Sequence, residues 1–305
     1  MRLASPLSIL LLALACATSA LAVEPVGIET ARGMVSFKSA PKTLAVYDAA
    51  SIDTLAALDV PIAGIPQNFS LDYLETVVKA AKPIGSLFDP DFQALSQLKP
   101  DLIIVGGRSA KAFDSVAKVA TAIDMTIPRD DLMAQTKAHT LAYGQLFAKT
   151  EAANALIAKL DTAIQQARKA AAGKGTGLVI LTNGTKVSAY GPGSRFGWIY
   201  SALGMEPATK DIKSGNHGDA ASFEFLLKVD PEWLLVIDRG SAINAEGSSA
   251  KETLDNELMH KTKAWKNNQI IYLNSKEVYI TSGGIQAQTH IMQDLTQAFG
   301  KADPQ

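Results

Sequence analysis

The chain has 305 residues, of which 47% are apolar and 19% are charged, and its formal net charge is −1. This length is sufficient for two α/β domains of ordinary size, and the composition is typical of a protein with well-buried cores. No basic run exceeds two residues. The charge therefore argues against a nucleic-acid partner and against a basic membrane-binding surface.

Residues 1–22 have the pattern of a signal peptide. Arg2 is followed by an apolar core at residues 7–15 and by a small-x-small cleavage site at residues 20–22. Cleavage there would remove Cys16, the only cysteine, so the mature chain would need no disulfide. The alternative is a lipid anchor on Cys16, although the usual leucine three residues before it is missing.

Residues 35–135 alternate between apolar runs and helical patterns, which predicts an N-terminal α/β lobe on a parallel sheet. The expected strands are residues 43–47, 61–65, 101–105 and 122–127. The expected helices are residues 52–58, 71–81, 92–98 and 110–120.

Residues 136–173 are predicted to form one long helix that connects the two halves. Before its terminal glycine, this segment contains no proline and a single glycine, Gly144, among strong helix formers. Leu156, Leu160 and Ile164 fall on one helical face. A helix of this length spans on the order of 50 Å. We therefore expect a rigid connector that permits only modest closure of the lobes.

Residues 175–303 repeat the alternation and predict a C-terminal α/β lobe. The expected strands are residues 177–182, 186–190, 233–237 and 269–273, and the expected helices are residues 196–203, 222–227, 251–260 and 285–299. The predicted fold class is therefore α/β: two Rossmann-like lobes with parallel-rich sheets, joined by one long helix, with a ligand cleft between them.

An internal repeat places an arginine in each lobe. Residues 92–108, FQALSQLKPDLIIVGGR, align without a gap with residues 223–239, FEFLLKVDPEWLLVIDR. Each copy has a helix, a proline and a buried apolar strand, and it ends in Arg108 or Arg239. Ligands of open α/β sheets bind at the carboxyl ends of the strands. The repeat therefore predicts an anion held between the two arginines.

A third arginine, Arg195, lies in the segment YGPGSRFG at residues 190–197. Its glycines allow close approach of a ligand, and Ser194 is a suitable N-cap for a following helix. The alternative is a tight turn with a solvated arginine. The glycine spacing matches neither a dinucleotide-binding fingerprint nor a phosphate-binding loop.

His217 and Tyr279 are further candidates, although a solvated loop histidine and a half-buried structural tyrosine are the ordinary interpretations. The other histidines share no metal-ligand spacing with His217. The chain also lacks a nucleophile elbow and a zinc-protease motif. The pattern favours binding over catalysis.

These features resemble the periplasmic siderophore-binding proteins of ABC iron importers, over essentially the whole mature chain. The similarity is greatest to the ferric-catecholate binders, whose five motifs are matched by residues 107–108 (GR), 193–197 (GSRFG), 216–218 (NHG), 236–239 (VIDR) and 279–284 (YITSGG). The resemblance implies a monomeric periplasmic receptor with no permanently bound cofactor.

The resemblance also implies roles for the candidate residues. Arg108, Arg195 and Arg239 would surround the catecholate oxygens, while His217 and Tyr279 would bind the Fe(III) of the siderophore directly. Fe³⁺ prefers about six ligands, mostly oxygen. A tetradentate bis-catecholate leaves two positions open, which the imidazole and the phenolate would fill.

In this family an acid on each lobe docks onto arginines of the membrane permease. Glu224 matches in the C-terminal lobe, whereas Gln93 occupies the equivalent place in the N-terminal lobe, where Asp89 or Asp91 would have to substitute.

Two other functions remain open. One is a receptor of the same fold for haem, cobalamin or a hydroxamate siderophore. The other is an exported α/β enzyme that uses His217 and Asp219 on an anionic substrate.

Overall fold

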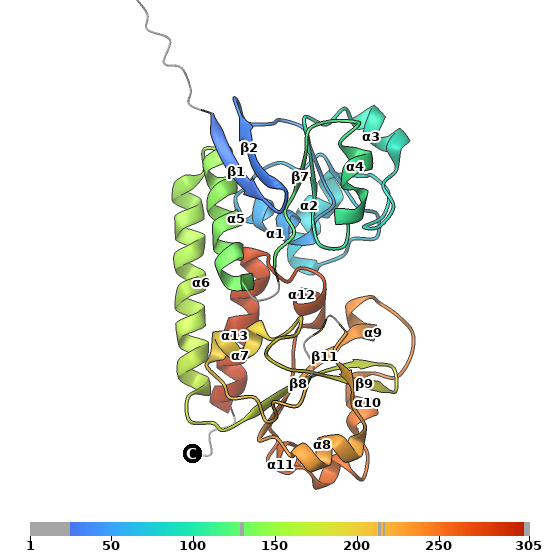
Figure 1. Cartoon of the computed structure of the whole chain (residues 1–305), viewed down its shortest axis with the longest axis vertical. Helices are drawn as coiled ribbons and strands as arrows, with labels where there is room; N and C mark the ends of the chain where they lie inside the picture. The colour runs from blue at the N-terminus through green and yellow to red at the C-terminus, as the bar shows by residue number, and fades with distance from the viewer. Residues whose placement is uncertain (1–24, 129–130, 213–214, 216, 302–305) are drawn as a thin grey trace, which may run out of the picture.

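The computed structural model describes residues 25–128, 131–212, 215 and 217–301. They form two α/β lobes, and α6 (Thr150–Ala171) runs along one side of both (Figure 1). This arrangement confirms the predicted fold class. The expected signal peptide and Cys16 lie outside the described residues. Among the residues that are described, no helix has the length and apolar character needed to cross a bilayer.

The N-terminal lobe is built on a parallel five-stranded sheet with the order β5-β4-β3-β6-β7. Its strands are β3 (Leu44–Val46), β4 (Gly64–Ile65), β5 (Lys82–Pro83), β6 (Leu102–Val105) and β7 (Ala122–Asp124). Its helical segments are α1 (Ala49–Ala57), η1 (Asp72–Leu74), α2 (Glu75–Ala80), α3 (Phe92–Leu98), η2 (Ala110–Ala112) and α4 (Phe113–Val116). An antiparallel hairpin that was not predicted, β1 (Val26–Thr30) with β2 (Gly33–Phe37), precedes this sheet.

The C-terminal lobe has a mixed sheet with the order β10-β9-β8-β11-β12, in which β9 and β10 are antiparallel to their neighbours. Its strands are β8 (Gly177–Asn183), β9 (Lys186–Tyr190), β10 (Asp219–Ala220), β11 (Trp233–Asp238) and β12 (Ile270–Tyr272). Its helical segments are α7 (Trp198–Leu203), α8 (Phe223–Val229), α9 (Arg239–Ala242), α10 (Ala250–Leu254), η4 (Met259–Lys261), α11 (Lys263–Lys266), α12 (Ser275–Tyr279) and α13 (Ile285–Lys301).

The sequence repeat is also a repeat of structure. α3 leads into β6 and α8 leads into β11, and both helices end at a residue in the left-handed conformation, Lys99 with φ 51° and Asp230 with φ 45°. The proline that follows each cannot continue a helix, which fixes the turn into the strand. Every residue of β6 is buried, as expected for a central parallel strand.

The prediction of one helix over residues 136–173 is wrong, because the segment forms two helices. α5 (Leu132–Leu146) ends before a short turn. α6 begins after this turn, at Thr150, and packs against α5. Ala148 in the turn has φ 55°. Gly144 allows close packing, since a Cβ there would lie 2.5 Å from the Cβ of Ala153. α6 alone, at about 33 Å, is the long connector.

A buried carboxylate of the N-terminal lobe holds the start of α13, which packs along α6 (Figure 1). Asp53 of α1 accepts hydrogen bonds from the backbone N–H of Gln286 at 2.8 Å and of Ala287 at 3.0 Å, and from the hydroxyl of Tyr73 at 2.7 Å. Burial, only partly offset by these bonds, raises the pKa of Asp53 to about 6. The lobes are therefore joined at a fixed point, which restricts their relative motion.

We predict that Gly144→Ala lowers the free energy of unfolding by about 1–3 kcal/mol, the usual effect of overpacking a tight contact. The new methyl group would press on Ala153 and on the carbonyl of Lys149. Gly300→Ala is the matched control, because nothing lies within 4 Å of a Cβ there and the position is helical. The control should stabilise the protein by about 0.5–1 kcal/mol. Urea unfolding of both variants measures the difference, and equal effects would contradict the contact.

Candidate anion site between the lobes

Three arginines from both lobes converge on Tyr279 at the end of α12. Arg108 and Arg195 each donate a hydrogen bond from Nη2 to the carbonyl oxygen of Tyr279, at 2.9 and 2.7 Å. Arg239 donates from Nε to the Tyr279 hydroxyl at 3.2 Å. The structure thus brings four of the predicted site residues into one place. Arg108 comes from the N-terminal lobe and the other three come from the C-terminal lobe.

The arginines also surround the ring of Tyr279. The Cζ atoms of Arg108 and Arg195 lie 4.7 and 4.4 Å from the ring centroid, within the range of a cation–π contact. Burial, followed by the charge of Arg108, lowers the pKa of Arg195. Within the described part of the chain, none of the three arginines forms a salt bridge with a carboxylate. Their positive charge is therefore available to an anionic ligand.

The loop that carries Arg108 requires glycine. Gly107 has φ 46°, and its backbone N–H donates to Thr126 Oγ1 at 2.9 Å. A Cβ on Gly106 would lie 2.8 Å from the side chain of Asp48. The glycine pair therefore turns the chain sharply beyond β6 and leaves Arg108 directed toward the second lobe.

Arg239 is held by a residue that the sequence did not single out. Its Nη1 donates to Oδ1 of Asn183, the last residue of β8, at 3.0 Å. An amide at the end of a predicted strand carries no signal of its own. The residue is identifiable only from the parallel pairing of β8 with β11, which places Asn183 beside the end of the strand that leads to Arg239.

The turn around Arg195 differs from the expectation in one respect. Ser194 is not the N-cap of the following helix, because α7 begins at Trp198 with Gly197 as its N-cap. Instead, Ser194 is buried and its hydroxyl donates to the carbonyl of Gly191 at 2.6 Å. This bond closes the turn on itself and fixes the backbone next to Arg195.

The pKa of the Tyr279 phenol is set by burial and by the neighbouring arginines. Burial is the largest single influence and would raise the pKa of Tyr279. The hydrogen bond from Arg239 and the charges of Arg108 and Arg195 together outweigh it, so the pKa lies below the usual 10.0. The other six tyrosines all have raised pKa values, mainly because of burial. Tyr279 is therefore the tyrosine best suited to act as a phenolate.

His217 lies on a loop beside the site but is exposed, and it makes no hydrogen bond or ring contact within the described residues. Its loop borders the site at two points. The N–H of Arg195 donates to the carbonyl of Gly215 at 3.2 Å, and Gly218 packs against the ring of Tyr190. The structure does not join His217 to Tyr279. No group of three or more His, Cys, Asp or Glu suited to a metal ion occurs among the described residues.

Gln93 and Glu224 occupy matching exposed positions in the first turns of α3 and α8. Of the two acids near Gln93, Asp91 is the N-cap of α3 and accepts hydrogen bonds from the backbone N–H of Gln93 and Ala94, both at 2.9 Å. Asp89 is exposed. Its backbone N–H donates to the hydroxyl of Ser86, whereas its carboxylate makes no hydrogen bond within the described residues. Asp89 is thus the free carboxylate nearest to Gln93 in sequence.

Two α/β lobes linked by a long helix, with three arginines gathered between them, are the architecture of a substrate-binding protein of the helix-linked class. The family model described as "Periplasmic binding protein" matches residues 44–277. The chain belongs to this family, whose members are binding proteins and not enzymes. This result confirms the resemblance that the sequence motifs indicated, and the alternative of an exported enzyme is not supported.

Several relatives are similar over nearly the whole chain. The petrobactin-binding protein YclQ of Bacillus subtilis is 35% identical over 266 residues, covering 86% of this chain and 83% of the relative. Its crystal structure matches with a TM-score of 0.86 over 91% of this chain and 99% of that one. The catecholate-siderophore-binding protein VctP of Vibrio cholerae is 27% identical, with a TM-score of 0.84 over 90% and 100% of the two chains.

We predict that Tyr279 is the first tyrosine to ionise as the pH is raised, below the usual pKa of 10.0. Ultraviolet difference titration should show one early phenolate transition that is absent in Tyr279→Phe. Arg239→Gln removes the hydrogen bond to the phenol and should move the transition to higher pH. Tyr272→Phe, which removes a phenol outside the site, should retain the early transition. If Tyr279→Phe also retained it, the electrostatic account of the site would be wrong.

Proposed function

We propose that this protein captures a ferric catecholate siderophore and delivers it to the permease of an ABC importer. The observation that carries the proposal is the set of three arginines around Tyr279, none of which has a carboxylate partner among the residues that the structure describes. A complete ferric tris-catecholate has a charge of about −3, which three guanidinium groups can balance. YclQ and VctP, whose names record petrobactin and catecholate siderophores, are similar over at least 86% of this chain.

Iron would arrive as part of the cargo, and the protein's own ligands would complete its coordination when the chelate is tetradentate. Tyr279 supplies a phenolate because the surrounding cations lower its pKa. His217 has no partner in the described structure and lies on a loop that touches the site at Arg195 and Tyr190. A loop movement would therefore break no side-chain bond of His217. We propose that His217 binds iron only when two positions are open.

We also propose where the permease docks. Glu224 and Gln93 occupy equivalent exposed positions in the first turns of α8 and α3, and these two helices lie at opposite ends of the molecule (Figure 1). Because Gln93 carries no charge and Asp91 is engaged as an N-cap, Asp89 is the acid that would pair with a permease arginine. The side chain of Phe88 beside it is 68% exposed, which adds an apolar contact.

The proposed location is the periplasm, with the protein acting as a monomer. Export follows from the signal peptide expected at residues 1–22, and a lipid anchor on Cys16 is the alternative form.

The alternative cargos are haem, cobalamin and hydroxamate siderophores. Neutral hydroxamate complexes would leave three unpaired arginines desolvated, which argues for the polyanionic catecholates.

The first test is a fluorescence titration of wild type with ferric bis-catecholate and ferric tris-catecholate, with absorption spectra recorded. Direct coordination predicts an iron–phenolate charge-transfer band with the bis-catecholate. His217→Ala combined with Tyr279→Phe should weaken the tetradentate complex by about tenfold or more, as expected for loss of ligand bonds, and the hexadentate complex much less. Equal loss for both would refute coordination, and preference for haem, cobalamin or a hydroxamate would refute the cargo.

The second test concerns docking. In proteoliposomes that contain the permease of the same importer, Glu224→Gln and Asp89→Asn should each reduce siderophore uptake several-fold, since each removes one interfacial charge pair. Gln93→Glu should increase coupling by restoring an acid at the place that matches Glu224. Siderophore affinity should not change in any of these variants. Normal uptake by Asp89→Asn would exclude Asp89 as the docking acid.

A further inference from the structure

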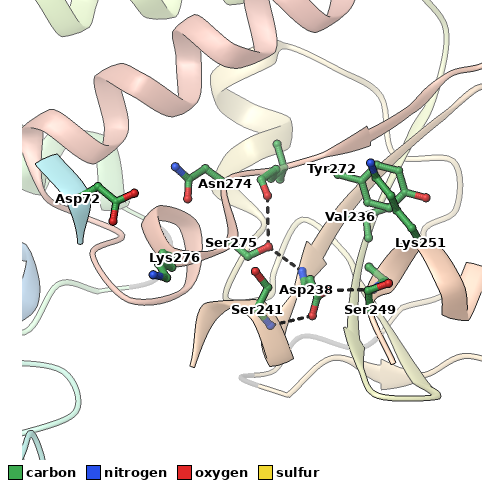
Figure 2. Close-up of a pocket in the computed structure, with 12 residues that line it drawn as sticks. Asp72, Val236, Asp238, Ser241, Ser249, Lys251, Tyr272, Asn274, Ser275 and Lys276 are labelled. Atoms are coloured by element: carbon green, nitrogen blue, oxygen red, sulfur yellow. Dashed lines mark hydrogen bonds between the residues drawn. The ribbon is translucent and has the colours of Figure 1, made fainter. Parts of the chain in front are cut away.

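In each lobe, the residue directly before the arginine of the sequence repeat is held by a hydroxyl group. The backbone N–H of Gly107 donates to Thr126 Oγ1 at 2.9 Å. The backbone N–H of Asp238 donates to Ser275 Oγ at 2.8 Å, the bond drawn between these two residues in Figure 2. Gly107 and Asp238 are aligned with each other in the sequence repeat. The two lobes therefore repeat this contact as well as the strand before it.

The two hydroxyls come from equivalent places in the sheets. Thr126 follows β7, which pairs with β6, and Ser275 follows β12, which pairs with β11. Each hydroxyl donates its own proton to the residue two positions earlier, Thr126 to Oδ1 of Asp124 at 2.6 Å and Ser275 to the carbonyl of Leu273 at 3.2 Å. A hydroxyl has a single proton to donate. Both oxygens are therefore oriented as acceptors for the backbone N–H next to the arginine.

In the N-terminal lobe, the hairpin β1–β2 holds the acid that orients Thr126. Asp124 is only 5% exposed, and its Oδ2 forms a salt bridge with Nε of Arg32, in the hairpin turn, at 3.3 Å. The backbone N–H of Ala31 donates to the carbonyl oxygen of Asp124 at 2.8 Å. Arg32 thus balances the charge of the acid, so Asp124 can order Thr126 without placing an unpaired negative charge near an anion site.

The arginines need such a support because they repel one another. Arg108 and Arg195 donate to the same carbonyl oxygen of Tyr279, and two like charges this close favour separation. The peptide group is planar, so a fixed N–H at Gly107 fixes the plane from which the chain enters the turn of Arg108. The N–H of Ser109 donates to the carbonyl of Gly106 at 3.0 Å and closes this turn from the other side. Hydrogen bonds weaken steeply away from their preferred geometry, so a small displacement of the turn would lose the bond between the lobes.

We propose that Thr126 and Ser275 are positioning residues for the anion site, Thr126 for Arg108 and Ser275 for Arg239. Each acts by fixing the backbone before its arginine and not by contact with the ligand. The proposal rests on the proposed function, in which these arginines bind the ferric chelate. Removal of either hydroxyl should therefore weaken the ligand only through its own arginine.

The first test measures the affinity for a ferric bis-catecholate by fluorescence titration of single and double variants. Thr126→Val and Ser275→Ala should each weaken binding by about threefold to tenfold, the scale of one hydrogen bond. Thr126→Val should weaken the Arg239→Gln protein to the same degree and should not weaken the Arg108→Gln protein. Ser275→Ala should show the reverse dependence. Thr126→Ser keeps the hydroxyl and should bind as wild type does.

A second test does not depend on the cargo. Tyr279 is the only tyrosine that is followed by an isoleucine, so carbonyl-¹³C tyrosine combined with ¹⁵N isoleucine selects its carbonyl in an HNCO NMR spectrum. Arg108→Gln should displace this signal, since it removes one of the two hydrogen bonds to the carbonyl oxygen. Thr126→Val should displace it in the same direction, and should add nothing in the Arg108→Gln protein. Thr140→Val removes a buried hydroxyl bonded within α5 and, as the matched control, should leave the signal in place.

Each contrary outcome has a defined meaning. Failure of wild type to bind the ferric chelate would overturn the proposed function, and the carbonyl signal alone would then decide the positioning proposal. Weakening of the Arg108→Gln protein by Thr126→Val, or of the Arg239→Gln protein by Ser275→Ala, would overturn the proposal, because the hydroxyl would then act by another route. An unmoved signal in Thr126→Val, or an equal displacement in Thr140→Val, would overturn it as well.

Discussion

The constraint on which the site depends is electrostatic: three guanidinium groups are held around one tyrosine, and no carboxylate among the described residues pairs with any of them. Like charges at this spacing repel, and burial adds a desolvation penalty, as the lowered pKa of Arg195 shows. Tyr279 offsets part of this cost in two ways. Its carbonyl oxygen accepts hydrogen bonds from Arg108 and Arg195, and its ring faces the same two guanidinium groups. Under the proposed function, an anionic ligand would relieve this repulsion, and the relief would favour binding.

This arrangement depends on the lobes keeping their relative position. Arg108 reaches Tyr279 from the other lobe, and a wide hinge opening would separate them. Two features oppose such an opening: α6 packs along α13, and Asp53 of α1 binds the first turn of α13. Only a short segment separates Tyr279 from Gln286, the residue of α13 whose N–H donates to Asp53, because Tyr279 precedes α13 by a few residues. The same joint that limits motion therefore also positions the tyrosine.

The sequence predicted the elements whose signals are local and repeated. The buried strands β6 and β11, each preceded by a proline, and the arginines that follow them were identified by the repeat alone. The break between α5 and α6 was missed because helix propensity is local, whereas the close contact of Gly144 with Ala153 exists only after the helices pair. Asn183 was missed for a similar reason: its role comes from a neighbour in the sheet, and an isolated amide has no pattern.

For the proposed ferric catecholate cargo, Tyr279 would allow one set of arginines to serve chelates of different charge. With a tris-catecholate of about −3, a neutral phenol leaves the three guanidinium groups to balance the ligand. With a ferric bis-catecholate, two catecholate dianions offset the trivalent iron to leave about −1, and the open coordination positions favour a phenolate. Ionisation of Tyr279 then contributes a further negative charge at the metal, where the arginines already lower its pKa. Under the proposed function, the phenol would thus adjust the charge of the site to that of the cargo.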